Sequence, residues 1–431
     1  MPASRSIGLW ALTGLMLNNM IGSGIFGVPG ELVRLLGRAS PLACVIAGLA
    51  IAVIIACFVE VGSQFSESGG PYLYVRTAFG RLLGIQVAWF TALAPIAAAA
   101  AQSTLFVSYL AGFYPALATG PGRVAAMVGV IGLPVVANLV GVQTGKVLSS
   151  VLVVAKLLPL AALIVAGLLY AGSSPTLTGP TPIAAVTPDA SIWLSAVLIA
   201  VFSFGGFENA LAATGEVRDP RRFVPFALGM SLLVCIVINA SIQWVTAFAL
   251  EYAANGSDRP LATAASVVMG PVGATLISVA ALISTSGAIS ATVLAVPRLL
   301  AALGRHGDLP AVLARAPDGG TPVVATLTVA AIVVLLGITG TFRWALAVTA
   351  GSMTIFAGAV CATLPRLRAL QPGAATVRVP GGRLLAVAGV GISLLLLLQL
   401  DRSEAVPIAI TVCVALVNWW LVRKRGLKAS Q

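Results

Sequence analysis

Charged side chains are scarce in this chain of 431 residues: Asp, Glu, Lys and Arg together make up 9% of it. A soluble domain carries about 25%. Hydrophobic residues make up 59%, and the mean hydropathy is +1.03. A chain of this length with so few charges cannot cover itself with a solvated surface. Lipid must therefore be its main solvent, and we expect an integral membrane protein.

The residues that build metal and redox centres are also few. The chain has one histidine, His306 in a basic loop, and no cysteine pair in CxxC spacing. The five cysteines are Cys44, Cys57, Cys235, Cys361 and Cys413. All lie in apolar stretches, so we interpret them as small buried hydrophobes. Without a Cys/His cluster a catalytic metal is disfavoured, and we expect no metal and no cofactor.

Signatures of membrane enzymes and channels are missing too. An enzyme would need paired aspartates for a metal or a Ser/His/Asp set, and one loop histidine with scattered acids does not supply these. A channel would need filter-like repeats or charged rings around a pore, and the sequence shows neither. Both classes are therefore disfavoured.

Long apolar stretches recur along the whole chain. A transmembrane helix needs roughly 20 mostly apolar residues, and the pattern predicts an all-α protein with twelve such helices. The first stretch begins almost at once and lacks a small-residue cleavage site, so we expect no signal peptide. The predicted spans lie near residues 7–35, 40–62, 83–113, 124–141, 148–172, 191–214, 222–250, 272–303, 323–340, 345–365, 383–400 and 406–422.

Basic residues are distributed unevenly between the two sides of the membrane. The net charge of +12 could indicate nucleic-acid binding, but the charges lie in short loops between spans. With the N-terminus inside, 18 of the 25 Lys and Arg residues lie in inner loops and tails, six lie in outer loops, and Lys156 lies within a span. This bias predicts a multi-pass protein of the cytoplasmic (inner) membrane with both termini in the cytoplasm. Nucleic acid is not an expected partner.

Two of the apolar spans are interrupted by glycines. The first contains Gly22 and Gly24 within NMIGSGIF, and the sixth contains Gly205 and Gly206 within FSFGGFEN. Each glycine weakens a helix by roughly 1 kcal/mol relative to alanine and lets the backbone leave helical geometry. Non-helical backbone at membrane depth survives only where it lines a cavity or is buried in protein. For either break alone, close packing of helices is an equal alternative.

The two breaks lie five spans apart, which is the spacing expected if residues 7–172 and 191–365 form inverted repeats. Interrupted helices at matching places in two halves are the best sequence pointer to a transporter's binding site. We therefore predict a secondary active transporter that works by alternating access. The predicted core covers residues 1–365, and residues 366–431 hold two further helices and a basic tail.

The predicted breaks have the chemistry to hold an amino acid. A broken helix exposes free N–H groups that suit a carboxylate and free carbonyls that suit an ammonium group. The amides of Ser23 and Gly24, with the Ser23 hydroxyl, are predicted to bind the carboxylate. The carbonyls near Met20, Phe202 and Gly205 are predicted to accept from the ammonium group.

Four stretches of the chain resemble the amino acid–polyamine–organocation superfamily. They are 22–26 (GSGIF), 67–80 (ESGGPYLYVRTAFG), 204–225 (FGGFE followed by GEVRDPRRFVP) and 304–310 (GRHGDLP). Over helices one to ten the chain is similar to bacterial amino acid permeases with the leucine-transporter-type fold. The resemblance implies a 5+5 inverted-repeat core, with helices eleven and twelve outside it. It also implies an α-amino acid or related amine as substrate, and Phe202 as an aromatic gate.

The substrate set is predicted to include residues beside the breaks and one on helix eight. The additional residues are Ile21, Ile25, Ser203 and Thr292. A well-known arginine exchanger of the family carries a tryptophan at the position of Thr292, and besides Glu208 the breaks have no acidic neighbour. A dibasic substrate would usually want a second carboxylate or an aromatic platform. We therefore expect a neutral amino acid, with an amine, polyamine or cationic amino acid exchanger (antiporter) of the same fold as the alternative.

Among the ionisable residues within the predicted spans, three stand out. Lys156 in helix five either extends to the inner surface or couples transport to protons, because an ammonium is costly to hold in a membrane. In some relatives a lysine here replaces a sodium ion and contacts helices one and eight, where Ser286 and then Ser290 are the expected partners. Glu208 is either a proton-sensitive group at the gate or an acceptor for freed amides. Glu60 is expected to be structural, paired with an inner arginine.

The expected partners are a small-molecule amino acid, protons and the lipid bilayer, with the protein as a monomer or homodimer. Symport, exchange and export stay open, because alternating access can move one scaffold in each of these ways.

Overall fold

The computed structural model describes residues 8–65, 69–140, 146–173, 188–208, 217–252, 257–316 and 321–429. Regular structure in these ranges consists of α-helices and short 3₁₀ turns (labelled η), which confirms the all-α prediction. Up to residue 173 the elements are α1 (Leu9–Met20), η1 (Ser23–Phe26), α2 (Val28–Leu36), η2 (Gly37–Ala39), α3 (Ser40–Gly62), α4 (Gly70–Phe79), α5 (Arg81–Ala111), η3 (Pro115–Leu117), α6 (Gly120–Leu139) and α7 (Lys146–Ser173).

The second half of the chain continues in the same way. Its elements are α8 (Ala190–Val201), η5 (Phe202–Phe204), α10 (Pro220–Tyr252), α11 (Pro260–Arg305), η7 (Ala311–Ala314), α12 (Val323–Thr339), α13 (Phe342–Leu370), α14 (Gly382–Leu397) and α15 (Arg402–Ala429). Helix α11 is two helices joined at a kink, because Gly270 has the non-helical angles φ 71° and ψ −168°.

Each predicted span overlaps one of these helices or a pair of them. In the described part of the chain, seven helical stretches are long and apolar enough to cross a membrane. They are 28–62, 81–111, 120–139, 221–250, 260–305, 342–370 and 402–423. Four shorter apolar helices cover 156–171, 190–204, 323–339 and 382–397. The twelve-span topology and the inverted repeat stay predictions.

Local sequence signals fix where helices begin. Helix α8 starts after Asp189, whose carboxylate accepts hydrogen bonds from the Ile192 amide and the Ser191 hydroxyl, both at 2.9 Å. These two bonds, in that order, lower the pKa of Asp189. Helix α13 starts in the same way after Thr341, whose hydroxyl accepts from the Trp344 amide. Such caps satisfy amides that have no partner inside the helix.

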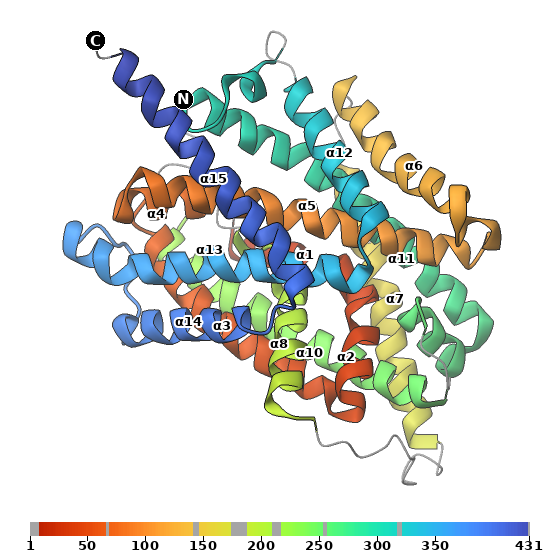
Figure 1. Ribbon diagram of the computed structural model, residues 1–431. Helices are drawn as coiled ribbons and strands as arrows, with labels where there is room; N and C mark the ends of the chain where they lie inside the picture. Colours follow the sequence, from red (N-terminus) through yellow and green to blue (C-terminus); the bar gives the residue numbers. More distant parts are fainter. Residues whose placement is uncertain are drawn as a thin grey trace.

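Helices far apart in the sequence pack side by side. Helix α13 lies between α5 and α14, α11 packs on α5, and α10 packs on both α1 and α3 (Figure 1). The core between them is made of buried apolar side chains. Many large apolar side chains also face outward, among them Leu133, Leu384 and Leu398, each more than 70% exposed. Such a surface suits lipid and not water.

Candidate substrate site

The first predicted break is present. Helix α1 ends at Met20, Ile21 and Gly22 have extended or irregular backbone (ψ 80° and −172°), and the chain then makes the 3₁₀ turn η1. Helix α2 begins only at Val28. The first apolar span is therefore two half-helices, as the glycine pattern predicted.

The second break is present as far as the structure describes it. Helix α8 ends at Val201, the turn η5 follows, and Gly205 has extended backbone with ψ 169°. Gly206 has φ +94°, a region that favours glycine. Residues 209–216, which include the rest of the predicted sixth span, lie outside the described residues, as do Glu67 and Ser68 of another quoted stretch.

The two breaks contact each other directly. A Cβ added at Gly206 would lie 2.4 Å from the Asn19 carbonyl oxygen, and one added at Gly24 would lie 2.5 Å from the Phe202 ring. The glycines thus do both things that the sequence left open: they interrupt the helices and let the interrupted segments approach. Phe202, the implied gate, is half-buried against the first break.

The donors predicted for a carboxylate lie at the start of η1. Ser23 is 1% exposed, and its hydroxyl has no hydrogen-bond partner in the described part of the chain. The amides of Ser23 and Gly24 open the turn, a position without a partner inside the turn itself. A buried polar group without a partner is costly, so a ligand that accepts from Ser23 would stabilise this arrangement.

The acceptors predicted for an ammonium group lie on both breaks. The Met20 carbonyl accepts from the Gly22 amide at 2.9 Å, and the Phe202 carbonyl accepts from the Gly205 amide at 3.4 Å. A carbonyl oxygen has two lone pairs, so each retains capacity for a further donor. Gly205 itself lies against Met353, whose Cε would be 2.6 Å from an added Cβ.

The remaining predicted substrate residues are buried around the breaks. Ile21, Ile25 and Ser203 are 1%, 3% and 6% exposed. Thr292 is 9% exposed and lies on α11, the helix that packs against η1. Because α11 is two helices joined at Gly270, the place of Thr292 beside the first break stays a prediction.

Lys156 lies behind the first break. Its ammonium donates to the Ile21 carbonyl at 2.6 Å and to the Asn18 carbonyl at 3.2 Å. This is the contact with helix one that the resemblance implies. The hydroxyls of Ser286 and Ser290 donate within α11, to the Ile283 and Ser286 carbonyls. The predicted contact of Lys156 with the eighth span, which lies in α11, stays a prediction.

Two carboxylates satisfy backbone amides. The Glu208 carboxylate accepts from the Gly206 amide at 3.1 Å, which is the structural reading of this residue; its role at a gate stays a prediction. Glu60, 0% exposed, accepts two hydrogen bonds from Arg368 at 2.6 and 2.7 Å and one from the Val379 amide at 2.8 Å. The predicted pairing of Glu60 with an arginine is confirmed, and the inner position of Arg368 stays a prediction.

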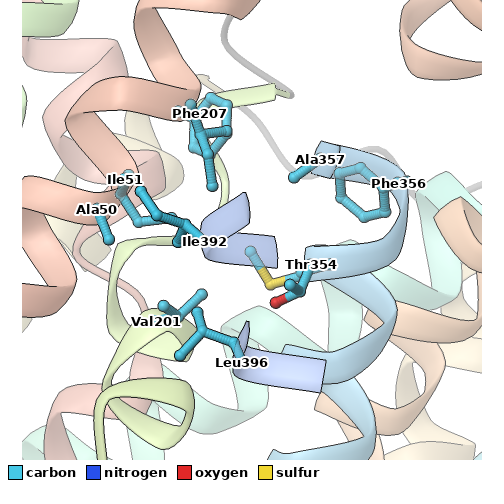
Figure 2. A pocket seen from close by; sticks show the side chains of 11 residues that line it. Ala50, Ile51, Val201, Phe207, Thr354, Phe356, Ala357, Ile392 and Leu396 are labelled. Atoms are coloured by element: carbon cyan, nitrogen blue, oxygen red, sulfur yellow. The ribbon is translucent and has the colours of Figure 1, made fainter. Parts of the chain in front are cut away.

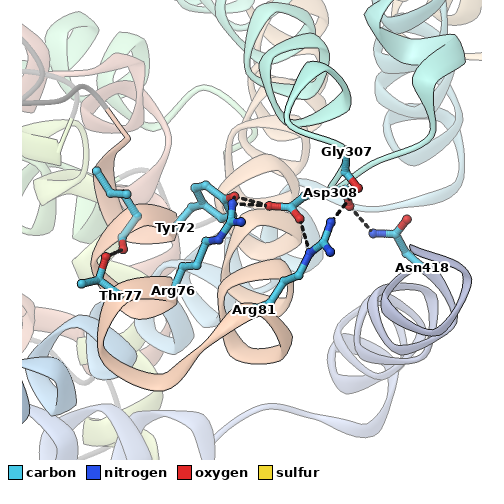
Figure 3. Close-up of polar contacts among 8 residues, drawn as sticks. Tyr72, Arg76, Thr77, Arg81, Gly307, Asp308 and Asn418 are labelled. Atoms are coloured by element: carbon cyan, nitrogen blue, oxygen red, sulfur yellow. Dashed lines mark hydrogen bonds and ion pairs between the residues drawn. The ribbon is translucent and has the colours of Figure 1, made fainter. Parts of the chain in front are cut away.

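A polar cluster lies apart from the breaks, at Asp308 (Figure 3). The Asp308 side chain, 1% exposed, accepts from Arg76 at 2.8 Å, from Arg81 at 2.6 Å and from the Tyr72 hydroxyl. Burial, followed by the bond to Asp308, raises the pKa of Tyr72 to about 12. Asn418 of α15 donates to the Asp308 carbonyl at 2.7 Å.

The stretches 67–80 and 304–310, which hold most of this cluster, resemble the superfamily in sequence, but the sequence does not show that they contact each other. The opposite charges of Arg76 and Arg81 in one predicted inner loop and Asp308 in another were the only sequence feature that could have indicated this contact. The cluster ties α4, the start of α5, the segment after α11, and α15 together.

A small apolar cavity of about 10 Å³ lies beside the second break (Figure 2). Helices α3, α8, α13 and α14 line it, with Phe207 beside the break. Thr354 is its one polar lining residue, and the Thr354 hydroxyl already donates to the Ala350 carbonyl. None of the predicted substrate residues lines this cavity.

Membrane-length helices around two touching breaks define the class of protein, a multi-pass membrane transporter. The sequence model of the amino acid permease family matches residues 7–418, nearly the whole chain. The chain belongs to this family.

Curated relatives agree with the family. The chain is 27% identical over 318 residues to a serine/threonine exchanger of Bacillus subtilis, covering 71% of this chain and 69% of the relative. It is 29% identical over 345 residues to a methylthioribose transporter of the same organism, covering 74% and 71%. An uncharacterized transporter of Mycobacterium tuberculosis is also 29% identical over 345 residues, covering 75% and 71%. The family and the two relatives with named substrates are transporters, not enzymes.

Proposed function

We propose that the protein carries a neutral α-amino acid across the cytoplasmic membrane by alternating access, with the substrate bound between the two breaks. One observation carries the proposal: the breaks touch at Gly24–Phe202 and Gly206–Asn19, beside the buried and unpartnered Ser23 hydroxyl of the described chain. Such a place offers both donors and acceptors of the backbone to a zwitterion.

In this proposal the two ends of the amino acid bind to different parts of the breaks. The carboxylate accepts from Ser23 and Gly24. The ammonium group donates to the carbonyls of Met20, Phe202 and Gly205. Because backbone groups make most of these contacts, they recognise the carboxylate and ammonium groups that all α-amino acids share.

A neutral side chain is favoured by what surrounds the breaks. Ile21, Ile25, Ser203 and Thr292 are uncharged and buried, and the Glu208 carboxylate already accepts from Gly206. The name of the first Bacillus subtilis relative assigns to it the exchange of serine and threonine, which are neutral amino acids. Phe202 is the proposed gate over this side chain.

Proton coupling is proposed to act through Lys156. Its ammonium bonds two carbonyls of the first broken helix, so the loss of its proton would remove the cation that holds this segment. Ser286 and Ser290 of α11 are the proposed partners of Lys156 when the transporter changes between its inward-open and outward-open conformations. Glu208 is proposed to respond to protons at the second break.

We propose that residues 1–365 form the transporter core, built from the inverted repeats 7–172 and 191–365. Helices α14 and α15 lie outside this core in the proposal. The positive-inside bias supports cytoplasmic termini.

Purified protein in liposomes tests the function. We expect radiolabelled neutral amino acids to accumulate when the proton concentration outside exceeds that inside, and accumulation to fall when an ionophore collapses the gradient. Arginine and putrescine, added in excess, should compete weakly. Failure of every amino acid to enter or exchange under all gradients would contradict the proposal, and strong competition by putrescine would favour the amine carrier.

A further inference from the structure

One face of α5 lies against the first break. The Tyr109 hydroxyl donates to the Phe26 carbonyl at 2.9 Å, and a Cβ added at Gly27 would lie 3.0 Å from Leu105 Cδ1. Tyr109 is 0% and Leu105 3% exposed, so both contacts are buried. The face of α5 that carries these two residues is therefore the one that meets the first broken helix.

Gln102 lies on this same face. It precedes Leu105 by three residues and Tyr109 by seven, and residues at these spacings share one side of a helix, with a drift of only about 20° per seven residues. Three residues correspond to about 4.5 Å along the axis. In the predicted topology α5 and the first broken helix cross the membrane in the same direction. Gln102 therefore lies one turn inward from Leu105, the residue that contacts Gly27, towards Ser23.

The Gln102 carboxamide contains a buried oxygen atom without a hydrogen-bond partner among the described residues. The residue is 9% exposed, and its Oε1 is buried without a hydrogen bond from any described group. Gln243 Oε1 also has no partner, but Gln243 Nε2 donates to the Pro29 carbonyl at 3.1 Å and to the Ser40 hydroxyl at 2.9 Å. Gln86 Nε2 donates to the Val412 carbonyl at 3.3 Å. The amides of those two glutamines join helices, whereas no hydrogen bond of Gln102 to another described helix is present.

The sequence around Gln102 makes the amide conspicuous. It directly follows the run 97–101, which is five alanines. Alanine packs without any polar atom, so a carboxamide at the end of such a run is costly unless something accepts or donates to it. Among the unpartnered polar atoms of the described residues, Ser23 Oγ and Gln102 Oε1 thus belong to elements that meet at the first break.

We propose that Gln102 reads the side chain of the substrate, and that the substrate is a neutral amino acid whose side chain carries a hydrogen-bond donor, namely a hydroxyl or carboxamide group. This inference rests on the proposed function, because it assigns the side-chain end of the same bound amino acid. Ser23 receives the carboxylate, and the Gln102 Oε1 accepts from the side-chain hydroxyl or amide. A site that hydrogen-bonds a substrate hydroxyl rejects the analogue that lacks it, because the polar group of the protein is then left unpaired.

Two substrate pairs isolate this contact. Serine differs from alanine by one hydroxyl, and threonine differs from valine by a hydroxyl in place of a methyl group. Transport of each radiolabelled amino acid into liposomes gives kcat/KM, and the ratio within a pair does not depend on the amount of active protein. We expect the wild-type protein to prefer serine and threonine over their partners by at least about tenfold.

Gln102→Met keeps the length of the side chain and removes the carboxamide, so we expect both ratios to fall to about one while alanine and valine are still transported. Gln86→Met is the matched control, on the same helix but bonded to α15, and should keep the wild-type ratios. A wild-type ratio near one would overturn the inference even if Gln102→Met does not fold. Unchanged ratios in Gln102→Met would also overturn it, while amino acid transport itself would stand. Absence of any amino acid transport in the wild-type protein would overturn this inference and the proposed function together.

Discussion

Ser23 is the side chain at which the proposed binding of the carboxylate can be tested with the least disturbance. Its hydroxyl has no partner among the described residues, so Ser23→Ala breaks no bond within the protein. A hydrogen bond to a charged group is worth about 1.5–3 kcal/mol. We therefore expect the substrate concentration for half-maximal uptake to rise by roughly tenfold or more, with no loss of thermal stability.

Ser103→Ala is the control for this change. Ser103 is also buried, but its hydroxyl donates to the Ala100 carbonyl within α5. Equal effects of the two substitutions on uptake would contradict the role of Ser23.

Lys156 is the residue to which the proposal assigns proton coupling. In Lys156→Ala the carbonyls of Asn18 and Ile21 lose their ammonium partner. The ratio of uptake with and without a proton gradient should then fall to about one, since an intramembrane lysine is costly unless it has such a role.

Arg34→Ala serves as the control for Lys156, because Arg34 is exposed and its pairing with Glu31 is a surface ion pair of little energetic consequence. Full proton-driven uptake by Lys156→Ala would show that the coupling lies elsewhere.

Single residues could be predicted from the sequence where their type is unusual for their surroundings. A lysine or a carboxylate inside an apolar span is conspicuous, which is how Lys156 and the pairing of Glu60 were found. Gln102 and Asp308 were not found. Their significance depends on which atoms come close after folding, and the arginines bonded to the Asp308 side chain precede it by more than 200 residues.

A substitution at Gly206 tests whether the second break must lie against the first. With φ +94° and the Asn19 carbonyl where a Cβ would go, Gly206→Ala combines backbone strain of about 1–3 kcal/mol with a clash against the first break. We expect this substitution to lower the melting temperature of the purified protein and to abolish transport.

Gly229→Ala is the matched control. Gly229 lies inside α10 with nothing within 4 Å of an added Cβ. Alanine is the better helix former by up to about 1 kcal/mol, so Gly229→Ala should leave transport intact and stability equal or higher. Normal transport by Gly206→Ala would contradict the close approach of the breaks.

Among the elements, the breaks themselves could be predicted because glycine pairs inside apolar spans are visible in one dimension. The kink at Gly270 and the helix α4 were not predicted. Gly270 and Pro271 lie just before the predicted span 272–303, and the apolar pattern does not show that they join two helices. Helix α4 has 10 residues and is too short to stand out as a span.

The Asp308 cluster concerns the whole molecule, because it joins α4, α5, α11 and α15. Asp308→Asn removes a buried charge from two arginines that are each about 40% exposed. Bonds to a charged group are worth about 1.5–3 kcal/mol, but water can compensate exposed arginines in part. We expect a loss of about 1–3 kcal/mol, seen as a lower melting temperature in detergent.

The exposed Asp258 provides the control for this loss, and Asp258→Asn should melt as the wild-type protein does. A wild-type melting temperature in Asp308→Asn would show that the cluster does not hold these helices together.

The central claim is that an amino acid binds where the two broken helices touch. Equilibrium binding of a radiolabelled neutral amino acid to purified protein tests it most directly, with the wild type, Gly206→Ala and Gly229→Ala measured side by side. The account predicts saturable binding of one molecule per chain to the wild type and to Gly229→Ala, and no binding to folded Gly206→Ala. Equal binding by all three proteins would contradict it.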